Sequence, residues 1–330
     1  MQRDVAGASL TAVSILAVMK LKRMGRASAL AIVDGPIDET EPESCREALL
    51  DRIRGRLPRV HSHTISDAWA RSEEQLNRGS ECGVCAISFH DDEYPPRLRK
   101  ISDPPALLFV KGDMQGLHAP RALAVVGTRK PTPNGGALAL RSGRIAVESG
   151  YAVISGLALG CDTAAHEGCL EAGGIGVAVL AHGLDRVYPA ANRDLADRLL
   201  DTGGCLTSEY PVGMTPTRSA FAQRDRIQSG LSDGVLVIET DIRGGTMHTV
   251  RFALEQERAL ACIHLDHLER FHSEVTTRGN RKLVEQGDAQ PIGDRAALIE
   301  FLNDLQLANA TQPAPKPAPA IRDPQMLLGF

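Results

Sequence analysis

The sequence predicts a doubly wound α/β domain built on a mostly parallel sheet. From Ala122 onward the chain repeats one order of segments: a short apolar run, a glycine-rich or polar turn, and a helical stretch. The spacing between runs, about 25 to 30 residues, is the length of a strand and a crossover helix. The runs lack polar alternation, which is typical of strands buried on both faces of a parallel sheet. The six runs begin at Ala122, Ala152, Val177, Cys205, Gly234 and Ala259.

The stretch between the fifth and sixth apolar runs shows the pattern expected of a crossover helix. Over residues 246–256, Met247, Val250 and Leu254 recur at helical spacing. These three side chains would form one apolar face. We therefore expect this helix to pack on the sheet through them.

A helical N-terminal region is predicted over residues 1–75. Its apolar run 5–19 is too short to cross a membrane and is followed by basic residues, so we expect a buried amphipathic helix and no membrane association. Residues 21–32, around Gly25, have the frame of a helix-hairpin-helix, whose turn offers backbone N–H groups to DNA phosphates; a simple packed pair of helices is an equal alternative. An acidic stretch, 34–51, follows.

Composition and charge exclude several classes of protein. The chain has 330 residues, with 37 Lys and Arg against 41 Asp and Glu, so its net charge of −4 excludes a wholly basic nucleic-acid binder but permits local patches. One Trp and four Tyr argue against binding through an array of aromatic platforms. Seven cysteines without a secretory signal indicate reduced thiols and a cytoplasmic protein.

Glycine and polar residues gather where the predicted strands end. Ligands bind at the carboxyl ends of strands in open parallel sheets, so the loops after five strands are expected to converge on one edge. Glycine lets a phosphate reach backbone N–H groups, and a helix N-terminus adds partial positive charge. Residues 121–150 hold five basic side chains against one acid, and Arg129 and Lys130 lie in the first turn. The sequence therefore predicts a phosphate-binding groove.

Two common nucleotide-binding motifs are missing from these loops. The dinucleotide fingerprint G-x-G-x-x-G needs a second glycine two residues after the first, and Gly127 is followed by Thr128 and Arg129. An acid should end the second strand, where the chain has Ser155. The P-loop pattern G-x-x-x-x-G-K-[ST] does not occur either, which argues against ATP hydrolysis of that kind.

The loops do resemble those of a known family. The segments 127–132, 155–162, 183–189, 208–211 and 221–232 look like the signature loops of the DNA-processing protein A family, also called DprA or Smf, and the resemblance covers about residues 90–293. It implies an extended Rossmann-like domain over 90–305 that binds single-stranded DNA and helps load the RecA recombinase during natural transformation or related DNA processing. It also implies a homodimer without established catalytic activity. We expect no cofactor and no metal.

The resemblance implies DNA contacts for particular residues. Arg129 would clamp a backbone phosphate, the hydroxyl and N–H groups of Thr128, Ser155 and Gly156 would donate hydrogen bonds, and three further arginines would extend a basic track. Leu159, Asp225 and Gly244 depart from the family pattern, and the first two would weaken DNA binding. The expected nucleic-acid or phosphate contacts are Gly127, Thr128, Arg129, Lys130, Ser155, Gly156, Arg193, Arg224, Arg226, Gly244, Gly245 and Thr246.

Two other functions compete with this one. Gly244–Thr246 upstream of Glu255 loosely resembles the phosphate and catalytic motif of the lysine-decarboxylase-like nucleotide hydrolases, in which Glu255 or Glu239 would polarise a water against an N-glycosidic bond. A nucleotide-sensing defence module using the same groove is the other alternative.

Two smaller signals favour ordinary structural roles. Cys82 and Cys85 form a single C-x-x-C with His61 and His63 upstream, but structural zinc normally shows a second pair, so free thiols are expected. His166, on a predicted helix near the groove, is interpreted as a packed, hydrogen-bonded residue rather than a catalyst.

The C-terminal residues 306–330 are predicted to be a flexible tail. A Pro/Ala-rich stretch over 311–324 precedes an apolar peptide. In that peptide Gln325, Leu328 and Phe330 follow a Q-x-x-L-x-F pattern, which resembles the peptides that dock on the bacterial sliding clamp. A partner motif and an end without a partner both remain open.

Overall fold

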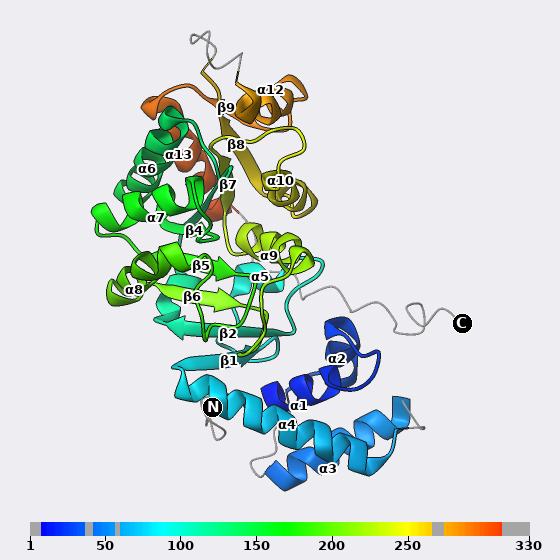
Figure 1. Cartoon of the computed structure of the whole chain (residues 1–330). Coiled ribbons are helices and arrows are strands. Elements are labelled where there is room, and N and C mark those ends of the chain that lie inside the picture. The colour runs from blue at the N-terminus through cyan, green and yellow to red at the C-terminus, as the bar shows by residue number, and fades with distance from the viewer. Residues whose placement is uncertain (1–7, 37–41, 57–59, 266–273, 312–330) are drawn as a thin grey trace.

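The computed structural model describes residues 8–36, 42–56, 60–265 and 274–311, and its centre is one nine-stranded sheet (Figure 1). The strands are β1 (Val84–Ser88), β2 (Leu107–Gly112), β3 (Ala122–Val126), β4 (Ala152–Ser155), β5 (Gly176–Leu180), β6 (Cys205–Ser208), β7 (Gly234–Val237), β8 (Ala259–Ile263) and β9 (Gln290–Ile292). The helices are α1 (Leu10–Met19), α2 (Arg26–Ile32), α3 (Pro42–Arg56), α4 (Ser62–Glu81), α5 (Pro96–Arg99), α6 (Pro133–Glu148), α7 (Cys161–Glu171), α8 (Arg193–Asp201), α9 (Arg218–Gly230), α10 (Thr246–Glu255), α12 (Arg278–Glu285) and α13 (Arg295–Thr311). Three short 3-10 helices are η1 (Met114–His118), η2 (Ala190–Asn192) and η3 (Val275–Thr277).

The sheet confirms the predicted doubly wound, mostly parallel α/β fold. Its strand order is β1-β2-β6-β5-β4-β3-β7-β8-β9, and every pair from β6 to β9 is parallel. The direction of winding reverses between β3 and β7, whose carboxyl ends are in register, with Val126 opposite Val237. A reversal of this kind opens a crevice at the carboxyl edge.

Helices cover both faces of the parallel strands. On β3, Leu123 and Val125 belong to a core shared with α6, α7 and α13, whereas Ala124 and Val126 belong to the core beneath α9 and α10. Successive side chains of a strand point to opposite faces, so an apolar run without polar alternation fills two cores at once. This explains why the six predicted strands all occur in the structure.

The N-terminal helices pack against the antiparallel edge of the sheet. Helices α1 to α4 share one apolar core with β1, β2 and β6. The buried helix expected within residues 5–19 occurs as α1, which starts at Leu10 and is capped by Ser9. Its expected amphipathic character is wrong, because α1 is buried from Leu10 to Val18 on all its faces. The acidic stretch 34–51 contains the first part of α3, and α4 continues to Glu81.

Three strands and one helix face differ from the prediction. β1 and β2 extend the sheet in antiparallel fashion beyond β6, and β9 closes the other edge. On α10, Val250 is buried as expected, but Leu254 is 42% exposed and Ala253 packs inward in its place.

Two further predictions concern the chain ends and membranes. Within the described ranges, no helix combines the length and the hydropathy needed to span a bilayer. The predicted partner motif of Gln325, Leu328 and Phe330 lies outside the described residues.

Candidate nucleic-acid interface

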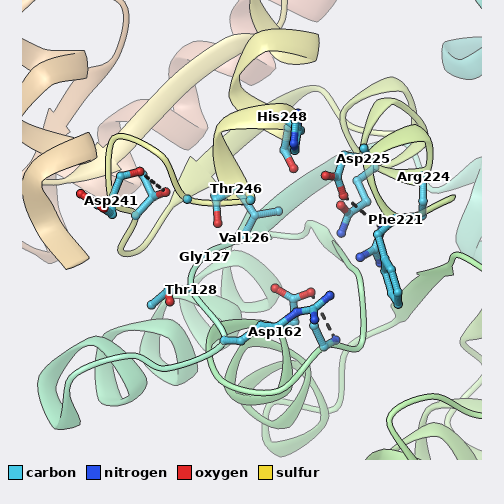
Figure 2. Close-up of a pocket in the computed structure, with 18 of the residues that line it drawn as sticks. Val126, Gly127, Thr128, Asp162, Phe221, Arg224, Asp225, Asp241, Thr246 and His248 are labelled. Atoms are coloured by element: carbon cyan, nitrogen blue, oxygen red, sulfur yellow. Dashed lines mark hydrogen bonds and ion pairs between the residues drawn. The ribbon is translucent and has the colours of Figure 1, made fainter. Parts of the chain in front are cut away.

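A pocket of about 580 Å³ opens at the carboxyl edge of the sheet, where the winding reverses between β3 and β7. Loops following β3, β4 and β7 line it together with α9 and the start of α10 (Figure 2). In Figure 2, Gly127, Thr128 and Asp162 face Thr246 and His248 across the pocket, while Phe221, Arg224 and Asp225 close one side. The predicted residues that line the pocket are Gly127, Thr128, Arg129, Lys130, Arg224, Gly244, Gly245 and Thr246.

The N-terminus of α6 is occupied by the protein's own carboxylate. Thr132 caps α6 through its hydroxyl, which accepts from the Gly135 N–H at 3.0 Å. Glu239, which follows β7, in turn accepts from the Thr132 N–H at 2.9 Å and from its hydroxyl at 2.6 Å. Glu239 is 4% exposed. A phosphate therefore has no place at the end of α6, although the β3–α6 turn was predicted to bind one there.

The N-terminus of α10 is open to the pocket. Gly245 is the N-cap of α10 and makes no side-chain capping bond. Apart from Gly245, its chain neighbours and the backbone of its own helix, no heavy atom of the described residues lies within 4 Å of the position that a Cβ of Gly245 would take. The first N–H groups of a helix attract anions through their hydrogen-bonding capacity and the helix dipole. The N–H groups of Met247 and His248 already donate to the carbonyls of Gly244 and Gly245 at 3.1 and 3.0 Å, so this end offers a phosphate chiefly the helix dipole, without the carboxylate cap that occupies α6.

Asn280 of α12 fixes the loop that leads to this helix end. Its side-chain oxygen accepts from the Thr240 N–H at 2.9 Å, and its side-chain nitrogen donates to the carbonyls of Ile238 and Ile263, both at 2.9 Å. Because Asn280 is fully buried, these three bonds hold the ends of β7 and β8 in a fixed relation. The loop from Thr240 to Gly245 is thereby presented to the pocket by a rigid base.

Three exposed cations surround the opening of the pocket. Arg129 and Lys130 lie on the β3–α6 loop, and Arg218 is the first residue of α9. The Arg129 guanidinium lies 4.9 Å from the centre of the Phe221 ring, and this ring contacts Tyr188, with centroids 5.9 Å apart. An exposed cation beside an aromatic ring can engage both the phosphate and the base of a nucleotide.

Arg224 also lines the pocket, but its guanidinium is bonded to the protein. It donates to the Gly156 carbonyl at 2.8 Å, to the Val179 carbonyl, and through Nε to Asp225 at 3.2 Å. Burial raises the pKa of Asp225 to about 6, although Arg224 opposes the shift and the charge of Asp162 adds to it. Burial also raises the pKa of Asp162, again against the effect of Arg224. The pocket therefore combines exposed cations with two buried carboxyl groups whose ionisation is disfavoured by burial.

Four predicted contacts lie elsewhere. The Ser155 hydroxyl is buried and donates to the Val125 carbonyl at 2.7 Å, and the Gly156 N–H donates to Asp162 at 3.1 Å, so both expected donors are already used. Arg226 is 1% exposed and holds Glu209 in a two-point ion pair at 2.6 and 2.9 Å. Its assignment to a basic track is wrong because its charge is paired inside the protein. Arg193 is exposed but does not line the pocket.

Close packing accounts for two of the loop glycines. A Cβ on Gly156 would lie 2.0 Å from Nη1 of Arg224, and one on Gly127 would lie 2.5 Å from Sγ of Cys161. These distances are far below van der Waals contact, so any larger residue would displace Arg224 or the start of α7. The two glycines thus let protein groups approach each other, in addition to any room they leave for a ligand.

Sequence reasoning missed several residues of the pocket wall. Arg218, Ala222 and Asp225 recur at helical spacing on α9 and form its pocket face together with Phe221. This periodicity was readable in the sequence and could have identified Arg218. His248 follows the predicted contact Thr246 by two residues, so only its position on the pocket side of α10 was not readable. Thr276 could not have been found in this way, because η3 reaches the pocket through the fold of a distant segment.

Other chemical candidates take no part in the pocket. His166 is fully buried as expected, but neither ring nitrogen has a hydrogen-bond partner among the described residues, and burial lowers its pKa to about 3. The expectation that it is hydrogen-bonded is therefore wrong. Cys82 and Cys85 form no disulfide, as expected, and the Cys85 thiol donates to the Val110 carbonyl at 3.5 Å. Across the part of the chain that the structure describes, no three His, Cys, Asp or Glu side chains are grouped as a metal site would need.

Comparison with known proteins identifies the family. The family model described as DNA recombination-mediator protein A matches residues 85–303, about two thirds of the chain. The chain belongs to this family. The matched residues contain the whole parallel sheet and every wall of the pocket.

Relatives with curated names extend the family match. The chain is 34% identical over 315 residues to protein Smf of Synechocystis, covering 88% of this chain and 76% of that protein. It is 43% identical over 169 residues to protein Smf of Escherichia coli, and this match covers 50% of the chain but only 44% of the E. coli protein. With the DNA processing protein DprA of Bacillus subtilis it shares 35% identity over 207 residues, 63% of this chain and 68% of that one.

Two solved structures of family members have the same fold. DNA processing protein A from Streptococcus pneumoniae superposes with a TM-score of 0.65 at 28% identity, over 88% of this chain and 95% of that one. The protein from Helicobacter pylori superposes with a TM-score of 0.59 at 27% identity, over 68% and 96%. That structure was solved to describe how the H. pylori protein binds single-stranded DNA.

Proposed function

We propose that this protein binds single-stranded DNA in the pocket at the carboxyl edge of its sheet and helps load a RecA-type recombinase onto that strand. In this proposal it acts in the cytoplasm as a homodimer and catalyses no reaction itself. One observation carries the DNA-binding part: the open N-terminus of α10 faces a rim of exposed cations, Arg129, Lys130 and Arg218. The family's description as a recombination mediator supports the part that concerns the recombinase.

The chemistry of the pocket favours a single strand over a duplex. Backbone N–H groups and cations bind phosphates of any sequence, and the rings of Phe221 and Tyr188 offer a surface on which bases can stack. Bases are accessible for stacking in a single strand but are paired and stacked inside a duplex. The net charge of −4 also opposes the coating of long duplexes.

A salt series tests the proposal. Fluorescence anisotropy with labelled oligothymidylate and with a duplex of equal length should show tighter binding of the single strand. The variant Arg129→Ala should bind it about tenfold more weakly, because a charge-assisted phosphate contact is lost. The slope of log affinity against log salt should become shallower by about 0.7, the value for one phosphate contact in a single strand.

Either of two outcomes would overturn the proposal. One is equal binding of the two DNA forms, and the other is an unchanged affinity for Arg129→Ala. Because Arg129 is exposed, its removal should leave the thermal unfolding midpoint where it is, which separates loss of contact from loss of fold.

The positions of Glu255 and Glu239 argue against the hypothesis of a nucleotide hydrolase. Glu255 lies at the far end of α10, is half-exposed, and pairs with Arg251 at 3.5 Å. Glu239 is buried and bonded to Thr132. Neither glutamate lines the pocket, so neither is placed to polarise a water against a nucleotide bound there.

A further inference from the structure

The turn between α1 and α2, here called the basic turn (residues 20–26), carries four cations that the pocket does not use. These are Lys20, Lys22, Arg23 and Arg26, and the sequence has no acidic residue between Asp4 and Asp34. Lys22 and Arg23 are exposed. The local charge of this turn is therefore positive, although the net charge of the whole chain is −4.

The positive charge of the basic turn is only partly balanced by its surroundings. Arg26 is paired with Asp103, its Nε lying 2.7 Å from a carboxylate oxygen. Lys20 donates instead to the uncharged side chain of Gln75. Burial lowers the pKa of Lys20, and the like charge of Arg71 on α4 lowers it further, with only Glu74 acting against them. Like charges held together in this way favour the arrival of an anion.

The basic turn lies next to the helix that forms a wall of the pocket. Nη2 of Arg26 donates to the side-chain oxygen of Gln223 on α9 at 3.3 Å. The neighbours of Gln223 in sequence, Ala222 and Arg224, line the pocket. Because a helix with its side chains is about 10–12 Å across, a strand that leaves the pocket over α9 reaches the basic turn within a few nucleotides. Figure 1 shows α2 on the side of α9 that faces the edge strands β1 and β2.

We propose that the basic turn is a second contact surface for single-stranded DNA, which holds the phosphates of the strand after it leaves the pocket. This inference rests on the proposed function, because it needs a strand already bound at the pocket. The ligands are the side chains of Lys22 and Arg23, with Lys20 adding to the local potential. Contacts of this kind are independent of base sequence and sensitive to salt.

The test uses two probe lengths and two double variants of the full chain. A labelled oligothymidylate of about 5 nucleotides fills the pocket alone, whereas one of about 20 nucleotides reaches both surfaces. Lys22→Ala/Arg23→Ala removes two exposed charges from the basic turn. Arg54→Ala/Arg56→Ala removes two charges from α3 in the same helical unit, near the opposite end of α2, where Arg56 approaches Asp34. It is the matched control for net charge.

The expected result is specific to length. Lys22→Ala/Arg23→Ala should weaken binding of the long probe about fivefold in moderate salt and make its salt slope shallower by about 1.4, with the short probe unaffected. The α3 control should change neither probe by more than about twofold. Both variants should keep the thermal unfolding midpoint of the parent, because the substituted side chains lie at the surface.

Three results would overturn the inference, and each is distinct from failure of the proposed function. Unchanged binding of the long probe would remove DNA as the ligand and leave an acidic protein surface as the partner of the turn. Equal weakening of both probes would show that the turn acts through the pocket. Equal weakening of long-probe binding by the α3 control would show that the loss follows the net charge of the protein and not the position of the basic turn. If the parent protein binds neither probe, the proposed function itself has failed.

Discussion

The β3–α6 loop and helix α9 both carry arginines, and Arg129 on the loop and Arg226 on the helix have opposite roles. Arg129, on the loop, is exposed and its charge is available at the rim. Arg226, on α9, is 1% exposed and its charge is paired with Glu209. Both residues belong to motifs that look equally basic in the sequence. The number of arginines in such motifs therefore overstates the number of DNA contacts, because burial beside a carboxylate converts a DNA ligand into a structural ion pair.

Removal of the buried charge of Arg226 is the variant with the largest expected effect. Arg226→Met should lower the free energy of unfolding by about 3–5 kcal/mol, because Glu209 would stay buried without its partner. Arg226 also donates to the carbonyls of Asp103 and Gln223, which would lose their bonds. We expect the thermal unfolding midpoint to fall by about 6 to 10 °C, measured by circular dichroism.

A double variant separates the ion pair from the packing of Arg226. Arg226→Met combined with Glu209→Leu removes both charges and should recover at least about half of the loss, since an apolar pair needs no desolvation of ions. If Arg226→Met keeps the parent midpoint but loses affinity for single-stranded DNA, then Arg226 is a DNA ligand after all and the contrast with Arg129 disappears.

The contrast between the two regions shows how far the sequence can predict the site. The apolar runs predicted the parallel strands because each fills two cores, and the loops predicted the edge on which the pocket opens. The role of Arg226 was not predictable, because its partners Glu209 and Asp103 come from segments 17 and 123 residues away. For the same reason β1 and β2 were missed: β2 joins the sheet by pairing with β6, a long-range contact that no local pattern encodes, and β1 joins it through β2.

Asp225 offers a smaller and opposite effect on DNA binding. Asp225→Asn should raise affinity for single-stranded DNA about fivefold at pH 7.5, because it removes a negative charge from the pocket wall and leaves Asp162 as the carboxylate that balances Arg224. The side-chain oxygen of asparagine can still accept from Arg224. A lower affinity in the variant would mean that Asp225 orders the pocket more than it repels phosphate.

The same residue predicts a pH dependence whose sign follows from its raised pKa. With a pKa of about 6, Asp225 is an anion above that pH and neutral below it, so the affinity of the parent protein should rise as the pH falls from 7.5 to 5.5. Asp162, Arg129 and Arg224 act on this group, and His248 lines the same pocket. The difference in pH profile between the parent and Asp225→Asn isolates the part that Asp225 contributes, and identical profiles would exclude it.

The finest test of the comparison uses two arginines that occupy the same local position. Arg193 begins α8 and Arg218 begins α9, and both are exposed, but only Arg218 lines the pocket. Arg218→Ala should therefore weaken binding of single-stranded DNA about fivefold, whereas Arg193→Ala should change it by less than about twofold. Both substitutions remove one charge from the first turn of a helix, so their effects on net charge and on helix stability are matched. Equal losses would mean that the strand extends across α8 as well, and that the DNA surface is wider than the pocket.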